Sequence, residues 1–190
     1  MNSKQIEKAI RELIIGLGDN PDREGLKDTP KRITKLYEKL FFGINKDARK
    51  KIKVYKTKNE DEMVILTDIS FYSMCEHHLL PFFGDVHIAY IPKNNYITGF
   101  SNIIDVVDII SKRLQIQERM TSEIADTINE ILNPLGLLVI VEARQFCIEL
   151  HGNNRKGIKT VTSAIRGALR KNATRQEALQ LIKKASKNAG

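Results

Sequence analysis

Reactive side chains gather at one point of the chain, where Cys75, Glu76, His77 and His78 follow one another. Cys75 and His78 have the C-x-x-H spacing with which one short turn can offer a sulfur and an imidazole to a single zinc ion. A tetrahedral ion needs a third ligand from the protein, and the only other cysteine, Cys147, is the candidate. The working hypothesis is a metal site that joins two distant parts of the chain.

The chemistry expected of such a site is hydrolytic. Three protein ligands leave one position open, which is typical of a catalytic zinc, and zinc lowers the pKa of bound water towards about 7. His77 is the neighbour of a ligand and cannot easily share the ion, so we expect it to transfer protons near the substrate. Glu76 is expected to orient one of the imidazoles or to shuttle a proton.

Two plainer interpretations of these residues stay open at this stage. A closed structural zinc would take a fourth ligand such as His151. Cys75 and Cys147 could instead form a disulfide or remain inert thiols. In a reducing cytosol, however, a lone pair of cysteines beside histidines is more typical of metal binding or catalysis.

The composition indicates one globular domain. The chain has 190 residues of which 42% are hydrophobic, enough for one substantial core. The longest apolar runs are far shorter than the ~20 residues that span a bilayer, so we expect no membrane partner. The N-terminus has no apolar segment typical of a secretory signal, and the sequence therefore predicts a cytoplasmic protein.

The net charge of +8 is compatible with an anionic partner such as a nucleotide. The excess lies largely in a basic linker over residues 50–58 and in the last helix, where solvated surface charge explains it equally well. We expect no nucleic-acid partner, because the chain has neither an aromatic-interleaved basic motif nor a helix-borne one.

Hydrophobic periodicity predicts the elements that position these residues. Apolar residues at helical spacing predict helices over 4–17, 29–43, 102–114 and 117–132, with Thr29 as N-cap of the second. A last helix is expected from the capping-box pair Thr174 and Glu177. Strand patterns cover residues 63–72, 85–91, 137–150 and 158–164.

The order strand-strand, helix-helix, strand-strand predicts an α+β domain. We expect a four-stranded antiparallel sheet with two core-facing helices on one face over residues 47–190, preceded by an N-terminal helical segment over residues 1–46. The reactive turn joins the first two strands, and the third strand delivers Cys147. His87 is more simply explained as a strand-face histidine than as a ligand. Because such a sheet leaves open edges, closure by subunits side by side is favoured.

Several long motifs resemble the GTP cyclohydrolase I family. They are Ser-Met-Cys-Glu-His-His-Leu-Leu-Pro-Phe-Phe-Gly over residues 73–84, Val-His-Ile-Ala-Tyr-Ile-Pro over 86–92, Leu-Gln-Ile-Gln-Glu-Arg over 114–119, Thr-Val-Thr-Ser over 160–163 and Thr-Pro-Lys-Arg over 29–32. The resemblance implies a tunnelling fold and a homodecamer of two stacked pentameric rings with shared active sites. It also implies zinc-assisted hydrolytic opening of the guanine five-membered ring at C8, release of formate and formation of dihydroneopterin triphosphate.

Position by position, the resemblance implies that Cys75, His78 and Cys147 hold the zinc and that His77 is the catalytic proton donor.

The resemblance also assigns substrate-binding residues. Gln117 and Glu118 match the pair that reads the guanine edge. This is chemically reasonable, because a carboxylate accepts hydrogen bonds from N1–H and the exocyclic amine of guanine, and those paired bonds reject adenine. Ser101 and Arg32 are expected to contact the substrate phosphates, and Lys35 is a further candidate.

Four positions depart from the family pattern. Gln145 replaces a second catalytic histidine, while Asn102, Asp105 and His151 replace cationic phosphate contacts. Charge-assisted bonds to phosphate contribute roughly 1.5–3 kcal/mol each, so triphosphate binding is expected to weaken. Glutamine cannot exchange a proton near neutral pH, so the reaction could stop at an opened formamide.

These departures leave two alternatives to a GTP cyclohydrolase. One is a zinc hydrolase of the same fold that opens a guanine nucleoside, monophosphate or free base without the triphosphate. The other is a non-catalytic, zinc-stabilised oligomer that binds a nucleotide or a protein. The retention of His77 beside an open-site ligand set argues against the second, because a binding protein needs no proton donor there.

Overall fold

The computed structural model describes residues 1–58, 62–150 and 157–187. The chain divides into two compact units, Met1–Phe42 and Gly43–Gly190. The sequence-based division into residues 1–46 and 47–190 stays a prediction. In the described ranges, no helix is long and apolar enough to cross a membrane.

Two amphipathic helices make up the first unit, as predicted. α1 (Ser3–Gly16) begins after Asn2, whose side-chain oxygen accepts a hydrogen bond from a backbone N–H of the first turn. α2 (Thr29–Leu40) has a proline in its first turn, where the missing N–H has no intrahelical partner in any case. The predicted N-cap is wrong, because Asp28 precedes the helix and Thr29 is its first residue, with no side-chain capping bond.

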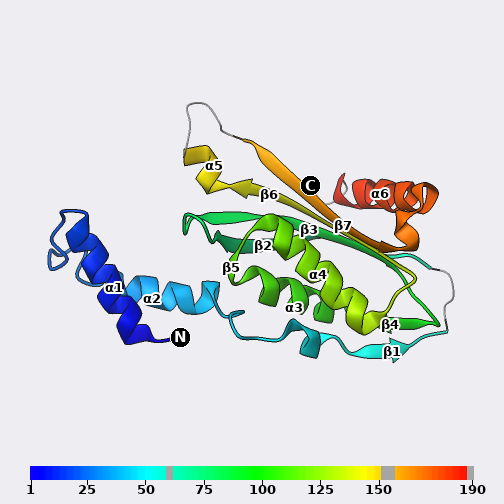
Figure 1. Ribbon diagram of the computed structural model, residues 1–190, viewed down its shortest axis with the longest axis horizontal. Helices are drawn as coiled ribbons and strands as arrows, with labels where there is room; N and C mark the ends of the chain where they lie inside the picture. The colour runs from blue at the N-terminus through cyan, green and yellow to red at the C-terminus, as the bar shows by residue number, and fades with distance from the viewer. Residues whose placement is uncertain (59–61, 151–156, 188–190) are drawn as a thin grey trace. The chain divides into compact units, whose positions relative to one another are not determined.

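The second unit is built on a five-stranded sheet with the strand order β5-β2-β3-β6-β7 (Figure 1). Its four long strands run antiparallel to one another, and they are β2 (Val64–Cys75), β3 (Pro81–Ile91), β6 (Gly136–Gln145) and β7 (Lys159–Gly167). The predicted α+β fold is thereby confirmed. The short strand β5 (Leu114–Gln115) is an addition, parallel to the end of β2. β1 (Val54–Lys56) and β4 (Tyr96–Thr98) form a separate antiparallel ribbon.

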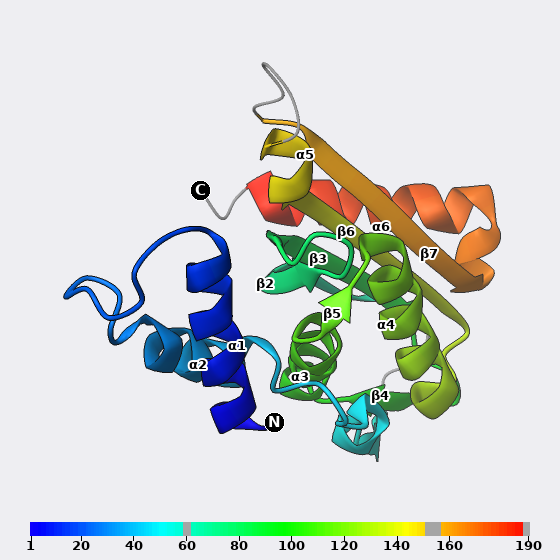
Figure 2. The same cartoon turned by 60° about the vertical axis from the view of Figure 1, so that its left-hand side comes forward.

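Two helices cover one face of the sheet, α3 (Phe100–Ser111) and α4 (Gln117–Leu132), and they lie beside each other (Figure 2). Most of their apolar residues recur at helical spacing and are buried, as the periodicity predicts, whereas Phe100 and Ile104 of α3 are exposed. In this layer α3 packs against β2, and α4 packs against β6 and β7.

The last helix corrects the prediction of helices on a single face. α6 (Asn172–Lys187) packs Ala178 and Ile182 against Leu138 and Ile140, on the side of the sheet opposite α3 and α4 (Figure 1). β6 is therefore buried on both sides, which explains its continuous apolar run. The predicted capping box is wrong, because α6 begins two residues before Thr174. Two short 3-10 helices, η1 (Ala48–Lys51) and η2 (Ala168–Arg170), complete the unit.

The segment after β6 also differs from the prediction of a strand to residue 150. β6 ends at Gln145 and the chain turns into a short helix, α5 (Phe146–Leu150), which carries Cys147. The ladder stops there because Gln145 pairs with Phe82, next to the first residue of β3, so no partner strand lies beyond it.

Candidate metal centre

The turn between β2 and β3 presents the first two candidate ligands. It is closed by two backbone hydrogen bonds, from the Cys75 N–H to the Leu80 carbonyl at 2.8 Å and from the Leu79 N–H to the Cys75 carbonyl at 2.9 Å. Leu79 has a φ of 52°, a left-handed conformation that costs a branched residue roughly 1–2 kcal/mol. The hydrogen bonds hold this conformation, and Cys75 Sγ lies 3.9 Å from His78 Nδ1.

The third candidate ligand, Cys147, reaches the turn because β6 ends beside the beginning of β3. One ligand atom from each of Cys75, His78 and Cys147 lies within 4.8 Å of the other two. Both cysteines are free thiols, which excludes the disulfide interpretation for this structure. Two sulfurs and one imidazole suit zinc, and the predicted group that can hold a metal ion is confirmed.

Burial raises the pKa of the Cys147 thiol, and the neighbouring Cys75 raises it further. Both effects disfavour the thiolate, which is the form that binds metal. A metal ion bound here therefore has to displace a proton from this sulfur.

His77 lies outside the ligand group. Its side chain is 63% exposed, and its ring is perpendicular to that of His78 with the centroids 6.3 Å apart. A carboxylate oxygen of Glu76 lies 3.9 Å from His77 Nε2. An imidazole in this position is accessible to a substrate while the adjacent imidazole takes part in the ligand group.

Glu76 is held by Arg119 of α4. The guanidinium faces both carboxylate oxygens, with Nη1 donating to Oε1 at 3.3 Å and Nη2 donating to Oε2. The hydrogen bond from Arg119 lowers the pKa of Glu76, and the charge of the guanidinium adds to the effect. The structure therefore shows Glu76 paired with Arg119, and its expected part in catalysis stays a prediction.

Arg119 belongs to a wider network that sequence reasoning missed. Its Nε donates to Gln115 Oε1 at 2.9 Å, and Gln115 Nε2 donates to Glu123 Oε2 at 3.0 Å. The Glu76 N–H also donates to the Gln115 carbonyl at 3.1 Å. These bonds tie the ligand-bearing turn to the first two turns of α4. Because 43 residues separate Glu76 from Arg119, no local spacing in the sequence signals the pair.

Replacing Arg119 with methionine is expected to weaken zinc binding by about tenfold, as is typical when the outer partners of metal ligands are removed. The apolar stem still packs, but Glu76 loses its partner and the turn loses its link to α4. Competition with a chromogenic chelator measures the effect. Arg166→Met is the matched control, because Arg166 pairs with Asp126 at 2.6 Å at the other end of the β6–β7 ladder. Equal zinc affinity in the two variants would contradict an anchoring role.

The two residues expected to read guanine begin α4. Glu118 is exposed, whereas Gln117 is 2% exposed and its side chain is engaged by the protein. Gln117 Nε2 donates to the carbonyls of Val141 and Thr160, while its Oε1 accepts from Thr160 Oγ1 and from Gln145 Nε2. Of the pair, only Glu118 has a side chain open to solvent.

The positions expected to contact phosphate belong to both compact units. Ser101 is exposed in the first turn of α3, where Asn102 donates to Thr98 Oγ1 at 3.2 Å. Asp105, one turn later, pairs with Lys51 at 3.2 Å. Arg32 belongs to the first unit, where it lies 3.6 Å from Asp28. His151, a candidate fourth ligand and a substituted phosphate contact, lies outside the described residues.

His87 is a strand histidine, as predicted. It is 5% exposed within β3, and its Nδ1 accepts a hydrogen bond from the Asp68 N–H at 3.2 Å. It does not belong to the group that can hold a metal ion.

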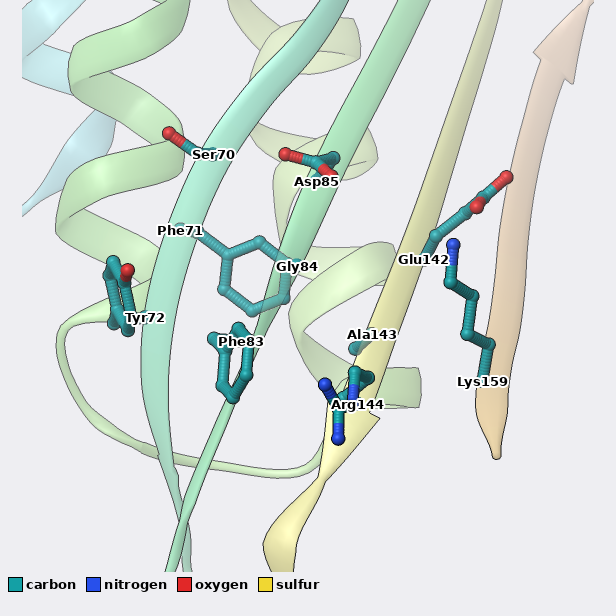
Figure 3. Close-up of a pocket in the computed structure, with 10 residues that line it drawn as sticks. All are labelled: Ser70, Phe71, Tyr72, Phe83, Gly84, Asp85, Glu142, Ala143, Arg144 and Lys159. Atoms are coloured by element: carbon teal, nitrogen blue, oxygen red, sulfur yellow. The ribbon is translucent and has the colours of Figure 1, made fainter. Parts of the chain in front are cut away.

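A separate cavity of about 270 Å³ lies on the sheet face shown in Figure 3. Tyr72 and Phe83 stack in its wall with ring centroids 5.7 Å apart, and the Arg144 guanidinium lies 5.9 Å from the Phe83 ring. None of the three candidate ligands lines this cavity. The site proposed from the sequence therefore does not use it.

Comparisons with known proteins agree with the motifs. A family model described as GTP cyclohydrolase I matches residues 6–183. A protein of Pelotomaculum thermopropionicum is 51% identical over 180 residues, 94% of this chain and 96% of its own. One of Carboxydothermus hydrogenoformans is 49% identical over 183 residues, 96% of this chain and 95% of its own. One of Bacillus subtilis is 45% identical over 185 residues, 97% of each chain. All three are named GTP cyclohydrolase 1. Because these matches extend over almost the whole sequence, the chain belongs to the GTP cyclohydrolase I family.

Proposed function

We propose that this protein hydrolyses the guanine imidazole ring of GTP at C8, releases formate and forms dihydroneopterin triphosphate. The observation that carries the proposal is the convergence of Cys75, His78 and Cys147 to within 4.8 Å, beside the exposed imidazole of His77, in a member of this family. No observation on the described residues favours either alternative, the hydrolase without triphosphate or the non-catalytic oligomer.

The proposed metal is zinc, held by Cys75, His78 and Cys147. The donor set fits, since two thiolates and one imidazole are ligands that zinc prefers, and three protein ligands leave one position open. When bound, zinc supplies a Lewis acid and an activated water at neutral pH.

His77 is the proposed proton donor. Its ring is exposed next to a ligand, so it can reach a group bound in front of the centre. The Glu76–Arg119 pair stays charged near neutral pH and holds the backbone from which His77 projects. Glu76 is thus proposed to assist catalysis by fixing the turn, a role other than the imidazole orientation or proton shuttling expected from the sequence.

Guanine recognition is proposed to rest on Gln117 and Glu118. The exposed carboxylate of Glu118 can accept hydrogen bonds from N1–H and the exocyclic amine of guanine. The buried side chain of Gln117 fixes the start of α4 against β6 and β7, and so fixes the direction of its neighbour. Ser101 and Arg32 are the proposed contacts of the triphosphate.

A ring-shaped homo-oligomer with shared active sites, a homodecamer of tunnelling-fold subunits, is proposed to complete these sites. Among the described strands, β5 pairs only with β2 and β7 pairs only with β6, so the sheet has two edges able to pair with neighbours. Adjacent subunits can then contribute residues to one another's sites.

The proposal is tested by incubating the zinc-loaded protein with GTP, GMP, guanosine and guanine in parallel and identifying products by mass spectrometry. We expect GTP to be consumed with release of formate and appearance of a pterin that fluoresces after oxidation. Faster consumption of GMP or guanosine than of GTP would contradict the proposal that the substrate is the triphosphate, GTP. An opened formamide that accumulates without formate would contradict the complete reaction.

A further inference from the structure

The side-chain amide of Gln117 has only one orientation that its surroundings permit. One end of the amide lies 3.0 Å from the Val141 carbonyl oxygen and 3.1 Å from the Thr160 carbonyl oxygen. Backbone carbonyls accept and never donate, so this end must be the NH2 group. The opposite end is therefore the carbonyl oxygen Oε1, fixed as an acceptor inside a buried residue.

The orientation of Gln145 follows from that of Gln117. Gln117 Oε1 accepts from Thr160 Oγ1 at 2.5 Å and from Gln145 at 2.8 Å. The atom of Gln145 that faces it must therefore be Nε2. A flipped Gln145 would place its carbonyl oxygen against that of Gln117 with no hydrogen between them, and two acceptors at this distance repel each other.

With its NH2 group committed to Gln117, Gln145 turns its own carbonyl oxygen towards the metal centre. This Oε1 lies 3.9 Å from Cys147 Sγ. A free thiol can donate weakly to it, whereas a metal-bound thiolate has no hydrogen to donate. In the metal-loaded protein, the half-buried oxygen therefore needs a donor from a group that enters the site.

We propose that Gln145 is the fixed hydrogen-bond acceptor of this site, which receives an O–H or N–H of the reacting guanine derivative or of the attacking water beside Cys147. This inference rests on the proposed function. An amide accepts the hydrogen bond without taking the proton, so Gln145 orients the group while proton transfer belongs to other residues. The chain Thr160–Gln117–Gln145 also connects the start of the guanine-reading helix with the third ligand.

The proposal predicts an order among substitutions at this position. Gln145→Leu removes the acceptor and is expected to lower kcat/KM by about 10–100-fold at unchanged zinc content. Gln145→Glu is expected to lower kcat/KM by a similar factor, because a carboxylate has no hydrogen to donate to Gln117 Oε1. Gln145→His is expected to keep at least the parent's activity, because a neutral imidazole donates through one nitrogen and accepts through the other.

A second measurement needs no substrate. When cobalt replaces zinc, the protein is expected to show an absorption band from charge transfer between the thiolate sulfur and the metal. The wavelength of this band depends on the polar groups beside the sulfur. The negative end of the Gln145 carbonyl raises the energy of the sulfur lone pairs, so Gln145→Leu is expected to move this band to shorter wavelength. Gln145→His keeps an acceptor beside the sulfur, so its charge-transfer band is expected at nearly the same wavelength as the parent's.

Ser163→Ala is the matched control, an exposed position on β7 whose partner across the ladder is Ile140. It is expected to change neither the cobalt band nor the rate. A Gln145→Leu variant with the parent's kcat/KM and the parent's band would overturn the proposal. If the parent itself does not act on GTP, the proposed function fails, while the cobalt spectra still decide whether Gln145 presents an acceptor to the centre.

Discussion

Replacing Cys147 with alanine is expected to remove the bound zinc and the hydrolase activity together. Cys147 is one of only three described residues that converge on the centre, and it is the one supplied by a different part of the fold. Zinc held by a full set of protein ligands contributes about 10–16 kcal/mol. Loss of one of the three ligands is expected to cost on the order of several kcal/mol, or more than about a thousandfold in affinity.

The zinc content of purified protein, measured by atomic emission, and the rate of formate release test this expectation. The parent is expected to hold about one zinc per chain. Because burial raises the pKa of the Cys147 thiol, zinc has to displace a proton, and the parent's zinc affinity is expected to increase with pH until that raised pKa is passed.

Ser163→Ala again serves as the control with normal zinc and activity. A Cys147→Ala variant that retains one tightly bound zinc per chain would show that the third ligand has been misassigned. A metal-free parent joined by a Cys75–Cys147 disulfide would contradict the whole scheme.

Replacing His77 with glutamine is expected to lower kcat by about 10²–10⁴-fold, the usual contribution of general acid–base catalysis. Glutamine keeps a hydrogen-bonding group of similar reach but cannot exchange a proton near neutral pH. The side chain is exposed and lies outside the ligand group, so zinc content and thermal stability are expected to remain those of the parent.

The neighbouring substitution His78→Gln separates the two roles. His78→Gln removes a proposed ligand and is expected to lose zinc and activity together. His77→Gln is expected to lower kcat while keeping the zinc. Steady-state kinetics with GTP and metal analysis of both variants provide the measurements. A His77→Gln variant with the parent's kcat, or one without zinc, would refute the assignment of His77 as proton donor.

Local spacing predicted part of the group that can hold a metal ion. Cys75 and His78 are three residues apart, and any turn short enough to join β2 to β3 brings such residues to one side. Cys147 was identified because no other cysteine exists, and the structure confirms that it joins the group. Helical and strand periodicities also predicted α3, α4 and the four long strands, because burial on one face leaves a periodic trace.

Other features depend on which strand lies beside which. β6 ends at Gln145 because its partner strand β3 begins at Pro81. The pattern of apolar residues does not reveal this register between the two strands. The apolar pattern of α6 likewise does not state which face of the sheet it covers, and the helix packs opposite α3 and α4. β5 has only two residues, too few for a periodic signal.

The sequence by itself determined the reactive groups of this protein: a C-x-x-H turn, a single distant cysteine and a second histidine within the turn. The tertiary structure alone decided how these groups are held. Arg119 fixes Glu76 across 43 residues, and Gln117 orients Gln145 across 28. Hydrogen bonds of this kind form only after strand register and helix packing have brought their partners together. The tertiary structure therefore determines the geometry of these hydrogen bonds, whereas the candidate ligands can be identified from the sequence.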